Sequence, residues 1–250
     1  MIIEDLIEIN RRLSHDLWNV SCFNKKLSGL SPRLIFPVNR INGEIRISEQ
    51  EARILYCNIL NNLNYFYSIE TPTIKTYQQK GSTPLSALSD LSIYTYTEQN
   101  SANSNEDKEK KIIFQKMANV ELKAHNPTKE NIRKDIEKII REKAHGNWVH
   151  ILKNIDKGTL PKLFNKFKYS FEKHNSEGAD KSILFHICIL EKKWGMMKIL
   201  QYKPSSGNNI TNLMEGFFCL DRNNSSNNIE GKEWKMQKDV LRDNGWTIIE

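Results

Sequence analysis

The chain has 250 residues, of which 38% are hydrophobic and 27% are charged, with a formal net charge of +7. This length and apolar content are enough for one globular domain with a sizeable core, and they exclude a chain that is disordered throughout. The basic balance favours a polyanionic partner, nucleic acid before a membrane surface. The charge is mixed, because 37 basic residues stand against 30 acidic ones.

Cysteine usage and the N-terminal segment indicate a reduced, cytoplasmic protein. The four cysteines lie far apart and form no Cys-x-x-Cys pair: Cys22, Cys57, Cys188 and Cys219. This spacing argues against a zinc ribbon and against a dense disulfide framework. Residues 1–5 are acidic where a signal peptide would be basic. The longest apolar run, 183–190, is too short to span a membrane.

The first half of the chain predicts two helices followed by strands. Residues 2–18 repeat apolar side chains at helical spacing, which predicts an amphipathic helix within an N-terminal brace, 1–47. Ser48 followed by Glu51 is a capping box, so a second helix is expected from there to Leu63. Alternating apolar and polar residues then predict three strands: 65–70, ended by Thr71-Pro72, then 88–96 and 112–124.

Only the polar segment 97–111 separates the second and third strands, which predicts an antiparallel hairpin with a flexible loop. The core, 48–155, is expected to contain a further helix at 128–143 and a strand at 147–152. A C-terminal extension, 156–250, is expected to contain a helix at 159–174 and strands at 182–190 and 196–202. The whole predicts a single α/β domain, 1–250, in which helices flank a mixed central sheet.

The segment 116–124 carries the residues most suggestive of chemistry. Its alternation places Glu121 and Lys123 on one face of a strand, opposite Val120 and Leu122. The predicted hairpin can bring Asp90 of the preceding strand beside Glu121. Two adjacent carboxylates suit Mg²⁺ or Mn²⁺, which can polarise a phosphoryl group and activate a water. A nearby ammonium can orient that water and offset developing charge.

Asp90 followed by Glu121-x-Lys123, on a helix–strand–strand–strand–helix–strand core over residues 48–153, resembles the PD-(D/E)XK nuclease superfamily. The resemblance implies a restriction-endonuclease-like αβββαβ core. It also implies that Asp90 and Glu121 bind the metal together with the Leu122 carbonyl, and that Lys123 positions or activates the attacking water.

Two features depart from the superfamily pattern, and one further acid fits it. Ser89 stands where the pattern has proline, and the polar segment 97–111 makes the gap between the two acids long. Glu51 would match the acidic residue that many members carry on the first core helix, as a further metal ligand. The capping box is an alternative explanation for Glu51, and a side chain does only one of these jobs at a time.

The function expected from this resemblance is Mg²⁺-dependent endonucleolytic hydrolysis of DNA, of a restriction or defence type. The alternative is a nucleic-acid-binding or protein-interaction module on the same fold that does not cleave. A third interpretation is an unrelated α/β protein in which Glu121 and Lys123 form a surface pair. The sequence does not decide whether the substrate is DNA or RNA, or whether cleavage is internal or at ends. It also leaves the oligomeric state open, and a homodimer is one of the alternatives.

Other charged residues have both an ordinary and a functional interpretation. Lys134 and Lys138 can line a phosphate groove, but charges on an amphipathic helix usually form its solvated face. The basic helix at 159–174 is a candidate phosphate-contacting surface. His150 alternates with apolar residues, which favours a histidine buried in the sheet over a metal ligand.

Overall fold

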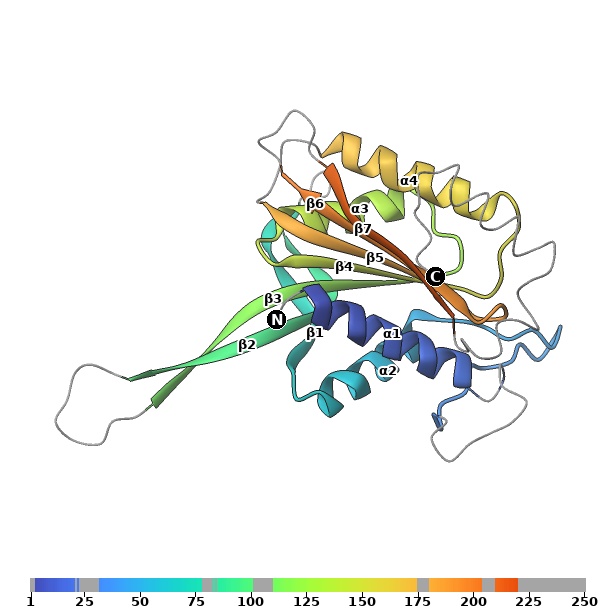
Figure 1. The fold of residues 1–250 in the computed structure, drawn as a ribbon, viewed down its shortest axis with the longest axis horizontal. Helices are drawn as coiled ribbons and strands as arrows, with labels where there is room; N and C mark the ends of the chain where they lie inside the picture. The colour runs from blue at the N-terminus through green and yellow to red at the C-terminus, as the bar shows by residue number, and fades with distance from the viewer. Residues whose placement is uncertain are drawn as a thin grey trace.

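The computed structural model describes residues 3–20, 22, 32–77, 83, 85–100, 110–174, 180–203 and 210–219. These residues form the predicted α/β fold, in which helices flank a mixed sheet (Figure 1). The helices are α1 (Ile3–Asn19), α2 (Glu49–Asn62), α3 (Lys129–Arg141) and α4 (Thr159–Lys173). The strands are β1 (Phe66–Tyr77), β2 (Leu85–Asn100), β3 (Lys110–Ala124), β4 (His145–Leu152), β5 (Lys181–Ile189), β6 (Trp194–Tyr202) and β7 (Ile210–Cys219). The predicted loop residues 101–109 and the chain beyond 219 lie outside the described residues.

The seven strands lie in the sheet in their chain order. The first three form an antiparallel meander, β3, β4 and β5 are parallel, and β6 and β7 are antiparallel again. Parallel neighbours need a crossover connection, and α3 and α4 supply the two that this sheet requires. The order α2-β1-β2-β3-α3-β4 therefore follows the predicted order of elements, and β5, β6 and β7 continue the same sheet.

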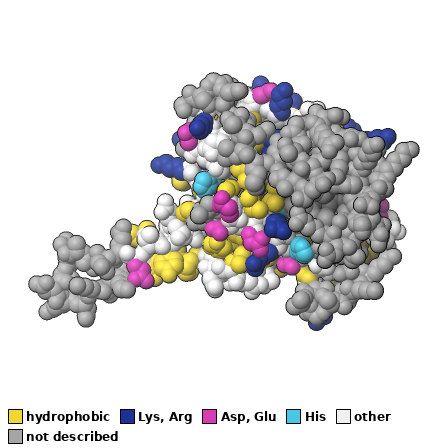
Figure 2. Space-filling model, viewed as in Figure 1, with side chains coloured by type: hydrophobic (Ala, Val, Ile, Leu, Met, Phe, Trp, Pro, Cys, Tyr) yellow, Lys and Arg dark blue, Asp and Glu magenta, His cyan; other side chains and the backbone are white. Residues whose placement is uncertain are grey.

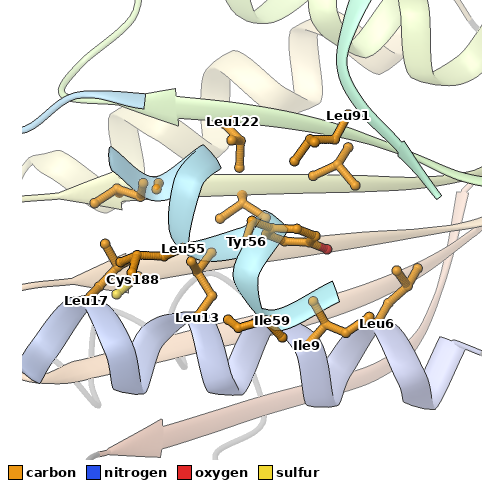
Figure 3. Packing of buried hydrophobic residues seen from close by; sticks show 14 of the residues in the cluster. Leu6, Ile9, Leu13, Leu17, Leu55, Tyr56, Ile59, Leu91, Leu122 and Cys188 are labelled. Carbon is orange, nitrogen blue, oxygen red and sulfur yellow. The ribbon is translucent and has the colours of Figure 1, made fainter. Parts of the chain in front are cut away.

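Each face of the sheet packs against its own pair of helices. On one face, α1 and α2 bury a cluster that includes Leu13, Tyr56 and Leu122 (Figure 3). On the other face, α3 and α4 bury a cluster that includes Ile136 and Trp148. Because side chains alternate along a strand, β3 directs Val120 and Leu122 to the first face and Glu121 to the second.

Local sequence signals explain where the helices begin. The Ser48 side chain accepts a hydrogen bond from the Gln50 amide at the start of α2. Thr128 does the same for the Asn131 amide, at 3.2 Å, at the start of α3. Both caps satisfy amides that have no partner within the helix. None of the described helices is both long and apolar enough to cross a membrane.

Strand β1 is longer than predicted. The Thr71-Pro72 step was expected to end it, but the strand continues to Tyr77 with a register shift between Pro72 and Thr76. Proline is tolerated here because β1 is an edge strand, where one side of the backbone needs no ladder partner.

Strands β2 and β3 are also longer than predicted, and they project from the body as a two-stranded ribbon (Figure 1). Their pairing extends from Leu91↔Val120 to Asn100↔Lys110. At the base of this ribbon the ring of Phe66 packs against two others, with ring centroids 5.3 Å from Tyr96 and 5.0 Å from Phe114. Between α1 and α2 the described residues form one isolated antiparallel bridge, Val38↔Ile45.

Candidate functional site

Asp90 and Glu121 come together where the β2–β3 ladder ends. The last regular pair at this end joins Leu91 to Val120, so Asp90 and Glu121 are the next residues on the two strands. The Leu122 amide donates a hydrogen bond to Asp90 Oδ2 at 2.8 Å. A side chain thus satisfies a backbone amide of β3, and this contact holds the Asp90 carboxylate against the strand that carries Glu121.

Asp90 is also held by a basic residue from α2. Arg53 donates from Nη2 to Asp90 Oδ1 at 2.7 Å, and its Nη1 lies 3.3 Å from Glu70 Oε1. The Arg53 side chain is only 12% exposed, so this ion pair is shielded from solvent. Both oxygens of Asp90 therefore have a donor, which fixes the orientation of the carboxylate.

Glu121 is fully buried and only half satisfied. Its Oε2 accepts a hydrogen bond from Lys138 Nζ at 2.6 Å, whereas Oε1 has no hydrogen-bond partner among the described residues. Burial raises the pKa of Glu121 to about 8; Lys138 opposes the rise, and the carboxylates of Asp135 and Asp90 add to it. A buried carboxylate beside two others is a position that favours a bound cation.

Lys123 lies on the same side of β3 and faces α3. Its Nζ is 3.2 Å from Asp135 Oδ2 and 3.9 Å from Glu49 Oε1. Burial lowers the pKa of Lys123, but the carboxylates of Asp135, Glu49, Asp90 and Glu121 outweigh it and raise the pKa above its ordinary value. The ammonium is therefore charged at neutral pH, which suits electrostatic positioning of a water rather than proton abstraction from it.

Lys138 turns toward the sheet, so its assignment to the solvated face of α3 was wrong. Its Nζ contacts Glu121, lies 2.9 Å from Asp135 Oδ1 and donates to the Leu88 carbonyl at 3.1 Å. Asp135 and Lys138 each immediately precede an apolar residue of the buried stripe, Ile136 and Ile139. That adjacency, with the i,i+3 spacing of the two charges, is the sequence signal that could have identified them.

Glu51 contacts the N-cap residue of its own helix. The Ser48 hydroxyl donates to Glu51 Oε2, so the two residues of the predicted capping box meet through their side chains. The acid of α2 that reaches the end of β3 is Glu49, whose Oε1 accepts from the Ala124 amide at 3.2 Å. Sequence reasoning missed Glu49 because it lies at the first turn of the helix, where an acid is ordinary.

His150 is a buried sheet residue, as the sequence indicates. Its Nε2 donates to the carbonyl of His125 at 2.7 Å. Burial lowers the pKa of His150 to about 4, so the ring is neutral at physiological pH. His125 itself has a positive φ of 62° and places its own Nε2 at 2.5 Å from the Ile47 carbonyl. These contacts tie the end of β3 to β4 and to the segment before α2.

Basic residues of α4 lie beside the segment that follows β3. Lys166 donates to Asn126 Oδ1 at 2.7 Å and to the Pro127 carbonyl at 2.8 Å. Burial lowers the pKa of Lys166, and the ammonium of Lys162 lowers it further. Figure 2 shows Lys and Arg side chains along the upper rim of the view, where α4 lies in Figure 1, with acidic side chains among them. The surface is basic but mixed.

The donor set has the right chemistry for a hard divalent cation. Asp90 and Glu121 supply carboxylate oxygens, and Oε1 of Glu121 has no hydrogen-bond partner among the described residues. Within the described ranges no group of three or more His, Cys, Asp or Glu is placed to hold a metal ion. Mg²⁺ needs fewer protein ligands than that, because it keeps several waters and binds through one or two carboxylates and substrate phosphate.

No protein-family model matches this chain, and no curated protein or solved structure matches it either. The case for a function therefore depends on the geometry of these residues.

Proposed function

We propose that the protein is a Mg²⁺-dependent endonuclease that hydrolyses DNA phosphodiester bonds, on a restriction-endonuclease-like core. The observation that carries this proposal is the convergence of Asp90, Glu121 and Lys123 at the end of the β2–β3 ladder. The surrounding topology supports it. A helix precedes a three-stranded meander, and α3 crosses from β3 to a parallel β4, as an αβββαβ core requires.

The residues of the site have separate roles in this proposal. Asp90 and Glu121 would hold the metal ion, which polarises the scissile phosphoryl group and lowers the pKa of a bound water. Arg53 keeps Asp90 oriented through the 2.7 Å ion pair. The charged Lys123 ammonium positions the attacking water and stabilises the negative charge that develops on the phosphorus centre. Lysines of α4 contact neighbouring phosphates of the DNA.

One observation favours the second candidate, a nucleic-acid-binding module that does not cleave. Asp90, Glu121 and Lys123 each already have an ion-pair partner within the protein: Arg53, Lys138 and Asp135. A site whose charges are all paired can be purely structural. In that case the basic surface of α4 would bind nucleic acid without turnover.

The test is cleavage of supercoiled and single-stranded DNA by the wild type and by Glu121→Gln. The substitution keeps the size of the side chain but removes the charge that binds the cation, so we expect Mg²⁺-dependent or Mn²⁺-dependent cleavage to fall at least 100-fold. DNA affinity should change little, because most phosphate contacts lie elsewhere.

Glu172→Gln is the matched control, because Glu172 is an exposed acid on α4 outside the site. It should cleave like the wild type. A wild-type protein that binds DNA but cuts no substrate with either metal would replace the nuclease proposal with the binding module. Full activity of Glu121→Gln would leave a nuclease whose site lies elsewhere.

A further inference from the structure

Three oxygens from three different elements converge on the ammonium of Lys138. Glu121 Oε2 of β3 lies at 2.6 Å, Asp135 Oδ1 of α3 at 2.9 Å and the Leu88 carbonyl of β2 at 3.1 Å. An ammonium has three N–H donors, and these contacts use all three. The Lys138 side chain is 12% exposed and Glu121 is fully buried, so the arrangement is a closed oxygen cage around a tethered cation.

Glu121 already holds a cation, the Lys138 ammonium. Each acid nearest the cage has a basic partner: Asp90 pairs with Arg53, Glu121 with Lys138, and Asp135 with both Lys138 and Lys123. A divalent cation that bound Glu121 would therefore compete with the Lys138 ammonium for that carboxylate.

We propose that Lys138 occupies the cation position in the metal-free protein and that metal binding displaces its ammonium from Glu121. This inference rests on the proposed function, because it assigns a role to Lys138 at the same metal site. Distances of 2.6 to 3.1 Å suit an ammonium, whereas Mg²⁺ binds oxygen at about 2.0–2.1 Å. An ion bound at Oε1 would share the carboxylate with the ammonium on Oε2, and the two positive charges would repel each other.

The other contacts of Lys138 show where the ammonium goes when it leaves Glu121. Asp135 and the Leu88 carbonyl remain as acceptors, so the lysine stays beside the site without losing every partner. The second oxygen of Glu121 supports the same reading. Oε1 has no hydrogen-bond partner in the described part of the chain, so it is the oxygen that an incoming ion would contact. Lys138 is thus a positioning residue that lowers the affinity of Glu121 for a metal ion.

The test measures metal affinity rather than cleavage. Mn²⁺ is titrated into the full-length protein, and free Mn²⁺ is followed by its electron paramagnetic resonance signal at one fixed pH. Lys138→Met should bind Mn²⁺ at least tenfold more tightly than the wild type, because it removes the competing charge. Protons compete for the same carboxylate, but a doubly charged ion gains twice as much as a proton when a neighbouring positive charge is lost.

Two further variants separate charge from packing. Lys138→Arg keeps the positive charge, so it should bind Mn²⁺ as weakly as the wild type. Lys138→Gln is the second neutral variant, and it should show the same tighter affinity if Lys138→Met fails to fold. Lys134→Met, on the exposed side of α3, removes an equal charge from outside the cage and should leave the affinity unchanged.

The outcomes distinguish this inference from the proposed function. Wild-type binding of Mn²⁺ that Glu121→Gln abolishes, with an unchanged or weaker affinity in Lys138→Met, would overturn the role of Lys138 and leave the nuclease site standing. A tighter affinity in both Lys138→Met and Lys138→Arg would also overturn it, since charge would not be the cause. Absence of Mn²⁺ binding in every variant would remove both proposals.

Discussion

The chemistry available to Glu121 follows from its position on β3. The alternation of the strand places it opposite Leu122, on the face covered by α3, where it is fully buried. Burial and the neighbouring carboxylates raise its pKa to about 8, while Lys138 works against this. The same position gives Lys123 enough acidic neighbours to remain charged. A buried acid and a charged lysine thus lie two residues apart on one face of β3.

A buried histidine far from this site provides a pH prediction for the fold. His186 of β5 is fully buried, with Nε2 at 2.8 Å from the Ser14 hydroxyl. Burial lowers its pKa to about 3 from the ordinary value of 6.5. The unfolded state therefore binds more protons than the folded state between these values, and stability falls as the pH is lowered from 6.5 toward 3.

Urea unfolding of the wild type and of His186→Gln at pH 7 and pH 5 measures this effect. Between pH 7 and pH 5 the free energy of unfolding of the wild type should fall by roughly 2 kcal/mol more than that of the variant, because each pKa unit corresponds to about 1.4 kcal/mol. His150 contributes equally to both proteins and cancels in the comparison. Equal losses in the two proteins would show that folding does not lower the pKa of His186.

At the scale of elements, the close contact between α3 and β4 limits the size of the side chain that position 146 can carry. Gly146 of β4 lies so close to the helix that a Cβ built on it would be 2.2 Å from Ile139 Cγ2. This close approach brings α3 down onto the sheet, and with it Asp135 and Lys138. A glycine here serves packing, since nothing about its backbone conformation requires one.

Gly146→Ala should destabilise the protein by about 1–3 kcal/mol, the usual cost of forcing an extra methyl group into a packed interior. The double variant with Ile139→Leu removes the methyl group that the new Cβ would meet, so it should recover part of the loss. Denaturant unfolding of the two single variants and the double variant measures the coupling. Strict additivity would mean that the two groups do not meet.

The sequence predicted helix boundaries well and strand lengths poorly. The caps at Ser48 and Thr128 are local signals, and α2 and α3 begin where those caps place them. The end of β1 was misplaced because Pro72 usually stops a strand, and its tolerance depends on the edge position of β1. The extra length of β2 and β3 depends on pairing between polar residues, which has no hydrophobic pattern to reveal it.

At the scale of the whole molecule, local sequence patterns also predict some neighbours within the candidate site and miss others. The sequence could place Asp90 near Glu121 and Lys123 because these residues lie on two consecutive antiparallel strands. The cations Arg53 and Lys138 were missed because they come from helices on opposite faces of the sheet. Their contacts depend on how α2 and α3 pack, and no short-range sequence pattern encodes that packing.

The net charge of +7 and the exposed lysines of α4 predict salt-dependent binding to DNA. Affinity for a labelled duplex, measured by fluorescence anisotropy in EDTA, should fall steeply between 50 and 200 mM salt because binding releases counterions. Replacing Lys162 and Lys168 by Gln should reduce the slope of the logarithmic plot by roughly one to two. Affinity that does not change with salt would exclude phosphate contacts as the basis of binding.

The central claim is that Asp90 and Glu121 bind a divalent cation, and the most direct test is a crystal structure with Mn²⁺. The account predicts an anomalous difference peak at coordination distance from both carboxylates, with the Lys138 ammonium moved away from Glu121. Two results would contradict it: a Mn²⁺ peak elsewhere in the protein, or no peak at saturating Mn²⁺ with the Glu121–Lys138 ion pair intact.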